Sequence, residues 1–227
     1  MTKRILHVVT NVDHYEKTND KTGLWLSELS HAWDVFADKG FVQTIISPVG
    51  GKSPIEPRSL KWPNLDRSAR NWLNNADKMK LLEHTLSAKD VSGQDYDAIY
   101  FTGGHAVMYD FVEDKELARI TREIFESGGV VSSVCHGYCG LLNTRLSEGQ
   151  YLISGRKLTG FSWLEEVIAG VSKKVPYNAE QQAIKQGANY VKSLLPFTPF
   201  VTVDGQLVTG QNPQSAKSTA KHVAALL

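Results

Sequence analysis

Short apolar runs alternate along this chain with segments that have the spacing of amphipathic helices, and this alternation constrains the fold more than any other feature. The apolar runs have the length of buried strands and cover residues 5–10, 42–47, 98–102 and 130–134. Helical spacing fills about 24–39 and 114–127. Strands that alternate with helices build a mostly parallel central sheet with helices on both faces. We therefore predict an α/β fold, and 227 residues suffice for a single domain over residues 1–227.

Glycines and prolines mark where these elements end. Gly40 is expected to end the first helix and Gly128-Gly129 the second, because glycine adopts the left-handed conformation that follows many helices. Residues 48–95 lose regular spacing and contain several prolines, so we predict an excursion of loops and short helices that forms a lid over a site. Later in the chain, Asp204-Gly205 predicts a tight hairpin and residues 216–227 a final helix.

The charge balance gives no sign of a nucleic-acid or membrane partner. The chain carries 25 basic and 24 acidic side chains, so it lacks the strongly basic surface that these partners select. No apolar run reaches the roughly 20 residues of a membrane helix, and the first residues are expected to form a strand rather than a signal peptide. The two cysteines, Cys135 and Cys139, do not make a disulfide framework, so we predict a reducing, cytoplasmic location.

Cys135 is the candidate nucleophile, because it follows the apolar run at 130–134 and precedes His136 and Gly137. A buried strand that turns sharply into a helix is the geometry of a nucleophile elbow. The N–H groups at the start of that helix are expected to lower the pKa of the thiol and favour the reactive thiolate. The alternative is an inert buried cysteine that packs as a small apolar residue. For Cys139 the alternatives are such a packing role and a resolving thiol.

Further candidates lie where other predicted strands and helices end, and sites in parallel sheets form beyond the carboxyl ends of strands. The N–H groups of Gly103 and Gly104 can stabilise an oxyanion together with that of His136, although glycines after a strand also serve simply as a turn. His105 either lines the site or caps the strand end. Glu28 lies about 100° around its helix from the apolar stripe, so spacing alone predicts a solvated side chain. The remaining histidines have no metal-ligand spacing.

The motifs at these positions resemble those of the DJ-1/PfpI superfamily, and within it the Hsp31-like branch. The resemblance covers nearly the whole chain and includes Thr22-Gly-Leu-Trp-Leu-Ser-Glu-Leu29, Pro54-Ile-Glu-Pro57, Phe101-Thr-Gly-Gly-His105, Val134-Cys-His-Gly137, Thr159-Gly-Phe-Ser162 and residues 203–213. It implies a flavodoxin-like sandwich, an architecture that class I glutamine amidotransferase domains share. Their catalytic His-x-Glu lies late in the chain, whereas here His222 is followed by Val223-Ala224, which argues against glutaminase chemistry.

The resemblance also implies roles for individual side chains. Glu28 corresponds to the family's glutamate that reaches the nucleophile and acts as acid or base, against the prediction from spacing. Cys135 corresponds to the nucleophile and His136 to the histidine of a catalytic triad. Glu166 corresponds to the acidic partner of that histidine, with Glu165 as the alternative.

Two positions depart from the family pattern. Tyr138 replaces the proline that is common after Cys-His-Gly, and Ala106 replaces a glycine that is common after Gly-Gly-His. Both side chains are expected to line the pocket, which leaves the size of the substrate open.

The leading hypothesis for function is a glutathione-independent glyoxalase of the glyoxalase III type, a lyase that converts methylglyoxal to lactate. Cys135 would form a hemithioacetal with this small reactive aldehyde, and neither a metal nor another cofactor is required. The resemblance also implies a homodimer. The alternative is a stress-related holdase chaperone or oxidant sensor, which predicts an exposed apolar patch around residues 48–95 or at a dimer interface. A cysteine peptidase or amidase ranks third, since Tyr138 is expected to narrow the pocket.

Overall fold

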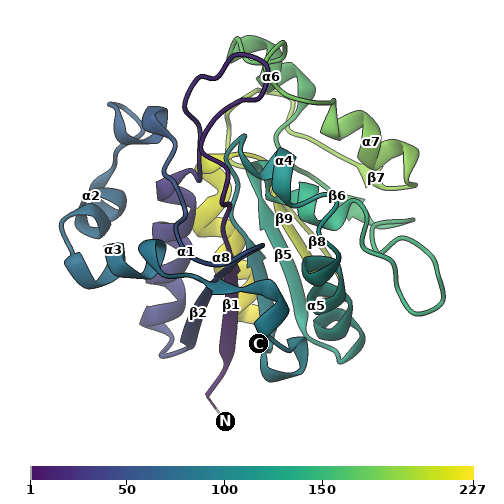
Figure 1. The fold of residues 1–227 in the computed structure, drawn as a ribbon. Helices are drawn as coiled ribbons and strands as arrows, with labels where there is room; N and C mark the ends of the chain where they lie inside the picture. Colours follow the sequence, from purple (N-terminus) through teal and green to yellow (C-terminus); the bar gives the residue numbers. More distant parts are fainter. Residues whose placement is uncertain (1) are drawn as a thin grey trace.

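A seven-stranded sheet forms the centre of the computed structural model, which describes residues 2–227 (Figure 1). The strand order is β3-β2-β1-β4-β5-β9-β8, and each neighbouring pair is parallel except β8 with β9. The strands are β1 (Arg4–Val8), β2 (Val42–Ser47), β3 (Leu86–Ser87), β4 (Ala98–Phe101), β5 (Val130–Val134), β8 (Val201–Asp204) and β9 (Leu207–Gly210). Two short strands, β6 (Lys157–Leu158) and β7 (Asn189–Tyr190), pair with each other in a separate small sheet. The predicted mostly parallel α/β fold is confirmed.

Helices cover both faces of the main sheet, with α1 and α8 packed together on one face and α5 on the other (Figure 1). The helices are α1 (Leu26–Asp38), α2 (Arg67–Leu73), α3 (Ala76–Glu83), α4 (Val107–Asp110), α5 (Lys115–Glu126), α6 (Trp163–Ile168), α7 (Ala179–Lys185) and α8 (Ala216–Leu226). Within residues 2–227, none of these helices is long and apolar enough to cross a membrane.

Consecutive side chains of β1 show why the strands are unbroken apolar runs in the sequence. Leu6 belongs to the core cluster that contains Ile120 of α5, whereas Ile5 belongs to the cluster that contains Phe36 of α1 and Val223 of α8. A strand that is covered on both faces needs apolar residues at successive positions rather than at alternate ones. The apolar runs in the sequence therefore reflect strands that are buried on both faces of the sheet.

Capping side chains and glycines mark the ends of helices and strands close to the positions that the sequence predicts. The Asp114 side chain accepts a backbone N–H of the first turn of α5 at 2.7 Å. Gly40, just after α1, has a φ of 70°, as expected for a glycine at this position. The hairpin is confirmed: β8 ends at Asp204, β9 begins at Leu207, and Gly205 has a φ of 58° in the turn between them.

Residues 48–95 contain loops, short helices and three 3₁₀ turns, which are Pro57–Leu60, Ala88–Asp90 and Gly93–Asp95. The segment packs on α1, because Trp72 and Leu82 belong to the same buried cluster as Leu24 and Leu29. Its first 3₁₀ turn brings Arg58 to the cavity at Cys135 that is described below.

Candidate active site

Cys135 lies directly after β5, at the carboxyl edge of the sheet, where the ends of β4 and β9 flank it. Its φ of 57° is left-handed, a conformation that costs a non-glycine residue about 1–2 kcal/mol. The chain then continues as a 3₁₀ helix, Cys135–Leu141. The structure therefore has the strand, strained turn and helix of a nucleophile elbow, with a side chain that is only 3% exposed.

Glu28 is fully buried, so the solvated side chain that its spacing predicted is wrong. The reason is that the first turn of α1 is buried on all sides, since residues 26–30 are all buried. The Gly103 N–H donates to Oε2 of Glu28 at 2.7 Å, and the carboxyl also interacts with the Cys135 thiol. Burial raises the pKa of Glu28 to about 8, against the opposing effect of these hydrogen bonds. Glu28 is thus a protonated acid at neutral pH with its carboxyl beside the sulfur.

The pKa of the Cys135 thiol is raised, so the prediction of a thiol pKa lowered by the following helix is wrong. Burial is the main cause, and the Glu28 carboxyl adds to it whenever it is charged. The backbone N–H of His136 donates to the sulfur and lowers the pKa, but this single group does not compensate for complete burial. The resting site holds a thiol, and a thiolate requires a base to remove its proton.

Backbone N–H groups at the ends of β4 and β5 lie close together beside the sulfur. The two strand ends approach so closely that a Cβ added to Gly103 would lie 2.8 Å from the backbone nitrogen of His136. Gly104 has a φ of 114°, and a Cβ there would lie 2.3 Å from the carbonyl oxygen of Gly23, so only glycine fits. Because Gly103 already donates to Glu28, an oxyanion on a carbon bound to the sulfur can use the N–H of Gly104 and that of His136, which donates to the sulfur in the resting site.

His136 connects the thiol to a buried carboxylate. Its Nδ1 lies 3.3 Å from Sγ of Cys135, and its Nε2 lies 2.9 Å from Oε2 of Glu166. The structure places Glu166, not Glu165, against the histidine. Glu165 instead caps the start of α6, where its Oε2 accepts hydrogen bonds from the backbone N–H and the hydroxyl of Ser162, both at 2.9 Å.

His105 lies in the site, packed against His136 with ring centroids 4.4 Å apart. Its Nε2 is 2.9 Å from Oε1 of Glu166, and its Nδ1 is 2.8 Å from Nη2 of Arg58. Burial lowers the pKa of His105 to about 4, so its imidazole is neutral at physiological pH. Burial alone would raise the pKa of Glu166, but its close contacts with His136 and His105 hold it far below its usual range. Glu166 is therefore ionised.

The donor atoms of His105, His136 and Glu166 lie within 4.8 Å of one another, a spacing that a metal ion could also bridge. Their hydrogen bonds do not fit this use. Arg58 donates to Nδ1 of His105 and so leaves the proton on Nε2, whereas a metal ligand needs a free lone pair there. In addition, Nε2 of His136 is already hydrogen-bonded to Glu166. The cluster fits proton transfer better than metal binding.

A cavity of about 210 Å³ opens beside the sulfur. It is lined by Trp25, Arg58, Asn64, Gly104, His105, Cys135, His136, Phe161, Ala169, Phe197, Pro213 and Gln214. Reasoning from the sequence missed Arg58, the only fixed cation among these residues. The one available signal was its place directly after the motif Pro54-Ile-Glu-Pro57, which matches the family pattern.

Tyr138 and Ala106 do not line this cavity, so their predicted place in the pocket is wrong. Both are fully buried. The Tyr138 ring packs against Gly160, where a Cβ would lie 2.1 Å from the ring, and its hydroxyl donates to the carbonyl oxygen of Phe161 at 3.3 Å. Tyr138 therefore supports the wall of the site from behind and does not narrow the entrance.

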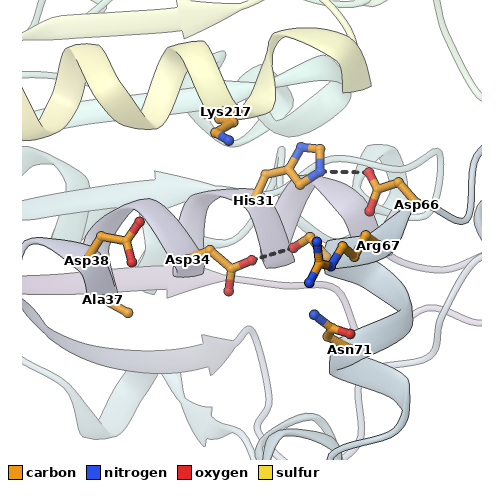
Figure 2. A pocket seen from close by; sticks show the side chains of 9 residues that line it. His31, Asp34, Ala37, Asp38, Asp66, Arg67, Asn71 and Lys217 are labelled. Carbon is orange, nitrogen blue, oxygen red and sulfur yellow. Dashed lines mark hydrogen bonds and ion pairs between the residues drawn. The ribbon is translucent and has the colours of Figure 1, made fainter.

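A larger hollow of about 860 Å³ lies between α1, α2 and α8 (Figure 2). Two contacts lie on its wall: Nε2 of His31 lies 2.6 Å from Asp66 (Figure 2), and the Ser68 hydroxyl donates to Asp34 at 2.6 Å. The hollow shares no lining residue with the cavity at Cys135 and contains no cysteine. The candidate active site is therefore the smaller cavity, where Cys135, the candidate nucleophile, meets His136 and Glu166.

Comparison with known proteins identifies relatives over the whole chain. Residues 23–226 match the model of the DJ-1/PfpI family. "Glyoxalase 3" of Candida albicans is 32% identical over 99% of this chain and 98% of its own length. "Glutathione-independent glyoxalase HSP31" of Saccharomyces cerevisiae is 33% identical over 96% of this chain and 95% of its own length.

Solved structures of similar proteins superpose on the whole fold. The crystal structure of the Rapid Encystment Protein 24 kDa of Francisella tularensis has a TM-score of 0.94 at 35% identity, and each chain is covered completely. The crystal structure of glyoxalase III from Candida albicans has a TM-score of 0.90 at 32% identity and covers 99% of this chain and 97% of that one.

Proposed function

The chain belongs to the DJ-1/PfpI family, and we propose that it acts there as a glutathione-independent glyoxalase that converts methylglyoxal to lactate. The family and the Hsp31-like branch predicted from the motifs are confirmed by the full-length relatives. The relatives' names support an enzymatic activity of this type. The observation that carries the proposal is the buried chain of Cys135, His136 and Glu166, which opens on a cavity with Glu28 beside the sulfur.

The first step is attack of the sulfur on the aldehyde carbon, C1. His136 takes the thiol proton on Nδ1, and the ionised Glu166 stabilises the resulting imidazolium. The C1 oxygen becomes an oxyanion, which the N–H groups of Gly104 and His136 can hold. The imidazolium then returns the proton to this oxygen, and the product is a hemithioacetal.

The second step moves hydrogen from C1 to the ketone carbon, C2. A base removes the C1 proton to give an enediolate, whose negative charge lies on the C2 oxygen. The proton of the C1 hydroxyl moves to that oxygen, and the base returns its own proton to C2, which gives a thioester. Glu28 and His136 are the two candidate bases; Glu28, which is protonated at rest, removes the proton only in the fraction of molecules in which its carboxyl is ionised. A carboxyl with a pKa of about 8 suits Glu28 to both directions of transfer, because proton exchange is most effective when the pKa lies near the working pH.

Hydrolysis of the thioester completes the cycle. Water adds to C1, the C1–sulfur bond breaks, and lactate and the free thiol are released. The aldehyde carbon is oxidised to a carboxylate while the ketone carbon is reduced to an alcohol, so electrons balance within the substrate. An outside oxidant or reductant is not needed for this conversion.

The proposal is tested by measuring lactate formed from methylglyoxal without glutathione. Wild type is expected to be active, while Cys135→Ala and Glu28→Gln lose turnover because nucleophile and acid/base are removed. Cys139→Ala is the matched control: this second buried cysteine lies outside the cavity, so its loss is expected to preserve turnover. A folded, reduced wild-type protein that forms no lactate would refute the proposal.

A second candidate function, a holdase chaperone, is favoured by one observation. A hollow of about 390 Å³ between α6 and α7 is lined by partly exposed apolar side chains, among them Leu164, Val167 and Ile184. In the segment 48–95 the exposed apolar side chains are Val49, Trp62, Leu81 and Leu86. The test measures how well Cys135→Ser and Val167→Glu suppress the aggregation of a client protein. This function would be supported if Cys135→Ser suppressed aggregation as well as wild type and Val167→Glu did not. Sedimentation of the same samples tests the homodimer that the resemblance implies.

A further inference from the structure

The two ring nitrogens of His105 have different surroundings, and this difference determines where its proton lies. Nδ1 is 2.8 Å from Nη2 of Arg58. A guanidinium group is always charged and can only donate hydrogen bonds, so Nδ1 must accept and the proton of the neutral ring must be on Nε2. His105 is therefore a donor through Nε2.

Arg58 is itself held in place, so the tautomer of His105 is set by a rigid group. Its Nε and Nη2 donate to the two oxygens of Glu56 at 2.9 and 3.0 Å, and Nη2 also contacts the Tyr15 hydroxyl at 2.6 Å. Glu56 is 1% exposed and accepts a further hydrogen bond from the Thr22 hydroxyl at 2.8 Å. A bidentate pair of this kind fixes the orientation of the guanidinium plane.

The Nε2–H of His105 is buried but has no well-aligned partner. Oε1 of Glu166 lies 2.9 Å away, close enough for an ionic contact, but the two atoms do not form a hydrogen bond. His105 is 4% exposed and lines the same cavity as Cys135. A buried donor without a good acceptor is costly unless a ligand completes it. The surroundings of His105 therefore indicate an acceptor that arrives in the cavity with the substrate.

We propose that His105 is a catalytic residue whose Nε2–H binds the ketone oxygen of a 2-oxoaldehyde, and that Arg58 is a positioning residue that fixes His105 in this tautomer. The inference rests on the proposed function. It adds a binding partner for the second carbonyl of that substrate, because His105 has a role only if this second oxygen is present.

The chemistry requires such a donor in addition to the oxyanion site. Negative charge develops on the C1 oxygen when the thiol attacks, but it develops on the C2 oxygen when the C1 proton leaves. The N–H groups of Gly104 and His136 are available for the first oxygen. The ring of His136 cannot serve the second, since its nitrogens contact the sulfur of Cys135 and the carboxylate of Glu166. A neutral imidazole N–H can stabilise an enediolate without giving up its proton, and burial keeps His105 neutral.

The kinetic test compares wild type with His105→Leu and His105→Gln, using methylglyoxal and native mass spectrometry. His105→Leu is expected to lose about 10²–10³-fold in kcat with a smaller change in KM, as when one oxyanion donor is removed. Because thiol attack is unaffected, the variant should accumulate one methylglyoxal on Cys135, an adduct absent from a His105→Leu/Cys135→Ala double variant. His105→Gln keeps an amide donor and should recover part of the rate. His7→Leu, at a buried histidine of β1 outside the cavity, is the matched control with unchanged kcat.

The tautomer test does not depend on turnover. Long-range ¹H–¹⁵N correlation of the histidine rings should show His105 protonated on Nε2 and unprotonated on Nδ1 in wild type. Arg58→Met should show a mixture of tautomers and a several-fold loss of kcat, and Arg58→Lys, which keeps a cationic donor, should restore both.

Each contrary result overturns the inference. If His105→Leu converted methylglyoxal at the wild-type rate, the ketone oxygen would need no such donor. If the variant lost both turnover and the adduct on Cys135, His105 would be assigned to thiol attack instead. A proton on Nδ1 of His105 in wild type would remove the role of Arg58. Failure of the proposed function is distinguishable, because wild type and Cys135→Ala would then be equally inactive.

Discussion

Glu28→Gln should make the protein more stable, by an amount that grows with pH. The carboxyl has a pKa of about 8 in the folded protein and 4.5 as the reference for the unfolded chain. Between these values the folded state binds a proton that the unfolded state has lost, so the stability of wild type falls as pH rises through this window. Glutamine keeps the shape and an acceptor for the Gly103 N–H but does not titrate.

The magnitude follows from the two pKa values. Each pH unit between them corresponds to about 1.4 kcal/mol. At pH 7, which lies roughly two and a half units above 4.5, Glu28→Gln should therefore raise the free energy of unfolding by on the order of 3 kcal/mol. Below pH 4.5 the two proteins should be equally stable, because the carboxyl is then protonated in both states.

Guanidinium unfolding of reduced wild type and Glu28→Gln from pH 4.5 to 8 measures this difference directly, and the pH dependence of other groups cancels in the comparison. Glu148→Gln, at an exposed side chain, is the control and should change stability by less than about 0.5 kcal/mol at every pH. A difference between Glu28→Gln and wild type that stays constant from pH 4.5 to 8 would refute a raised pKa for Glu28.

Two further predictions concern the triad and the strained turn. Glu166→Gln should lower kcat about 10³–10⁴-fold, because a neutral amide neither stabilises the His136 imidazolium nor fixes its tautomer. Lactate assays measure this loss, and a kcat near that of wild type would exclude Glu166 from the triad. Cys135→Gly should be more stable than Cys135→Ala by about 1 kcal/mol in guanidinium unfolding, because glycine tolerates the φ of 57°; equal stability would show that the turn relaxes in both variants.

The sequence predicted the frame of the site better than its chemistry. The position of Cys135 after a buried strand follows from an apolar run and a turn, which are local properties. The direction of its pKa shift was wrong, because the prediction counted the following helix and not complete burial or Glu28. Tyr138 was misplaced for a related reason: neighbours along the chain do not reveal that its ring packs behind the site against Gly160.

The periodicity of the sequence by itself determined the parallel sheet, the helices on both faces and the carboxyl edge at which a nucleophile would lie, because each depends on spacing within a few residues. Only the tertiary structure decided which polar groups meet there. Glu28, Arg58, His105 and Glu166 come from four separate segments, and their approach depends on how those segments pack. Burial then sets which of these groups carry charge, since the pKa of a carboxyl or imidazole responds to the loss of water and to its new neighbours.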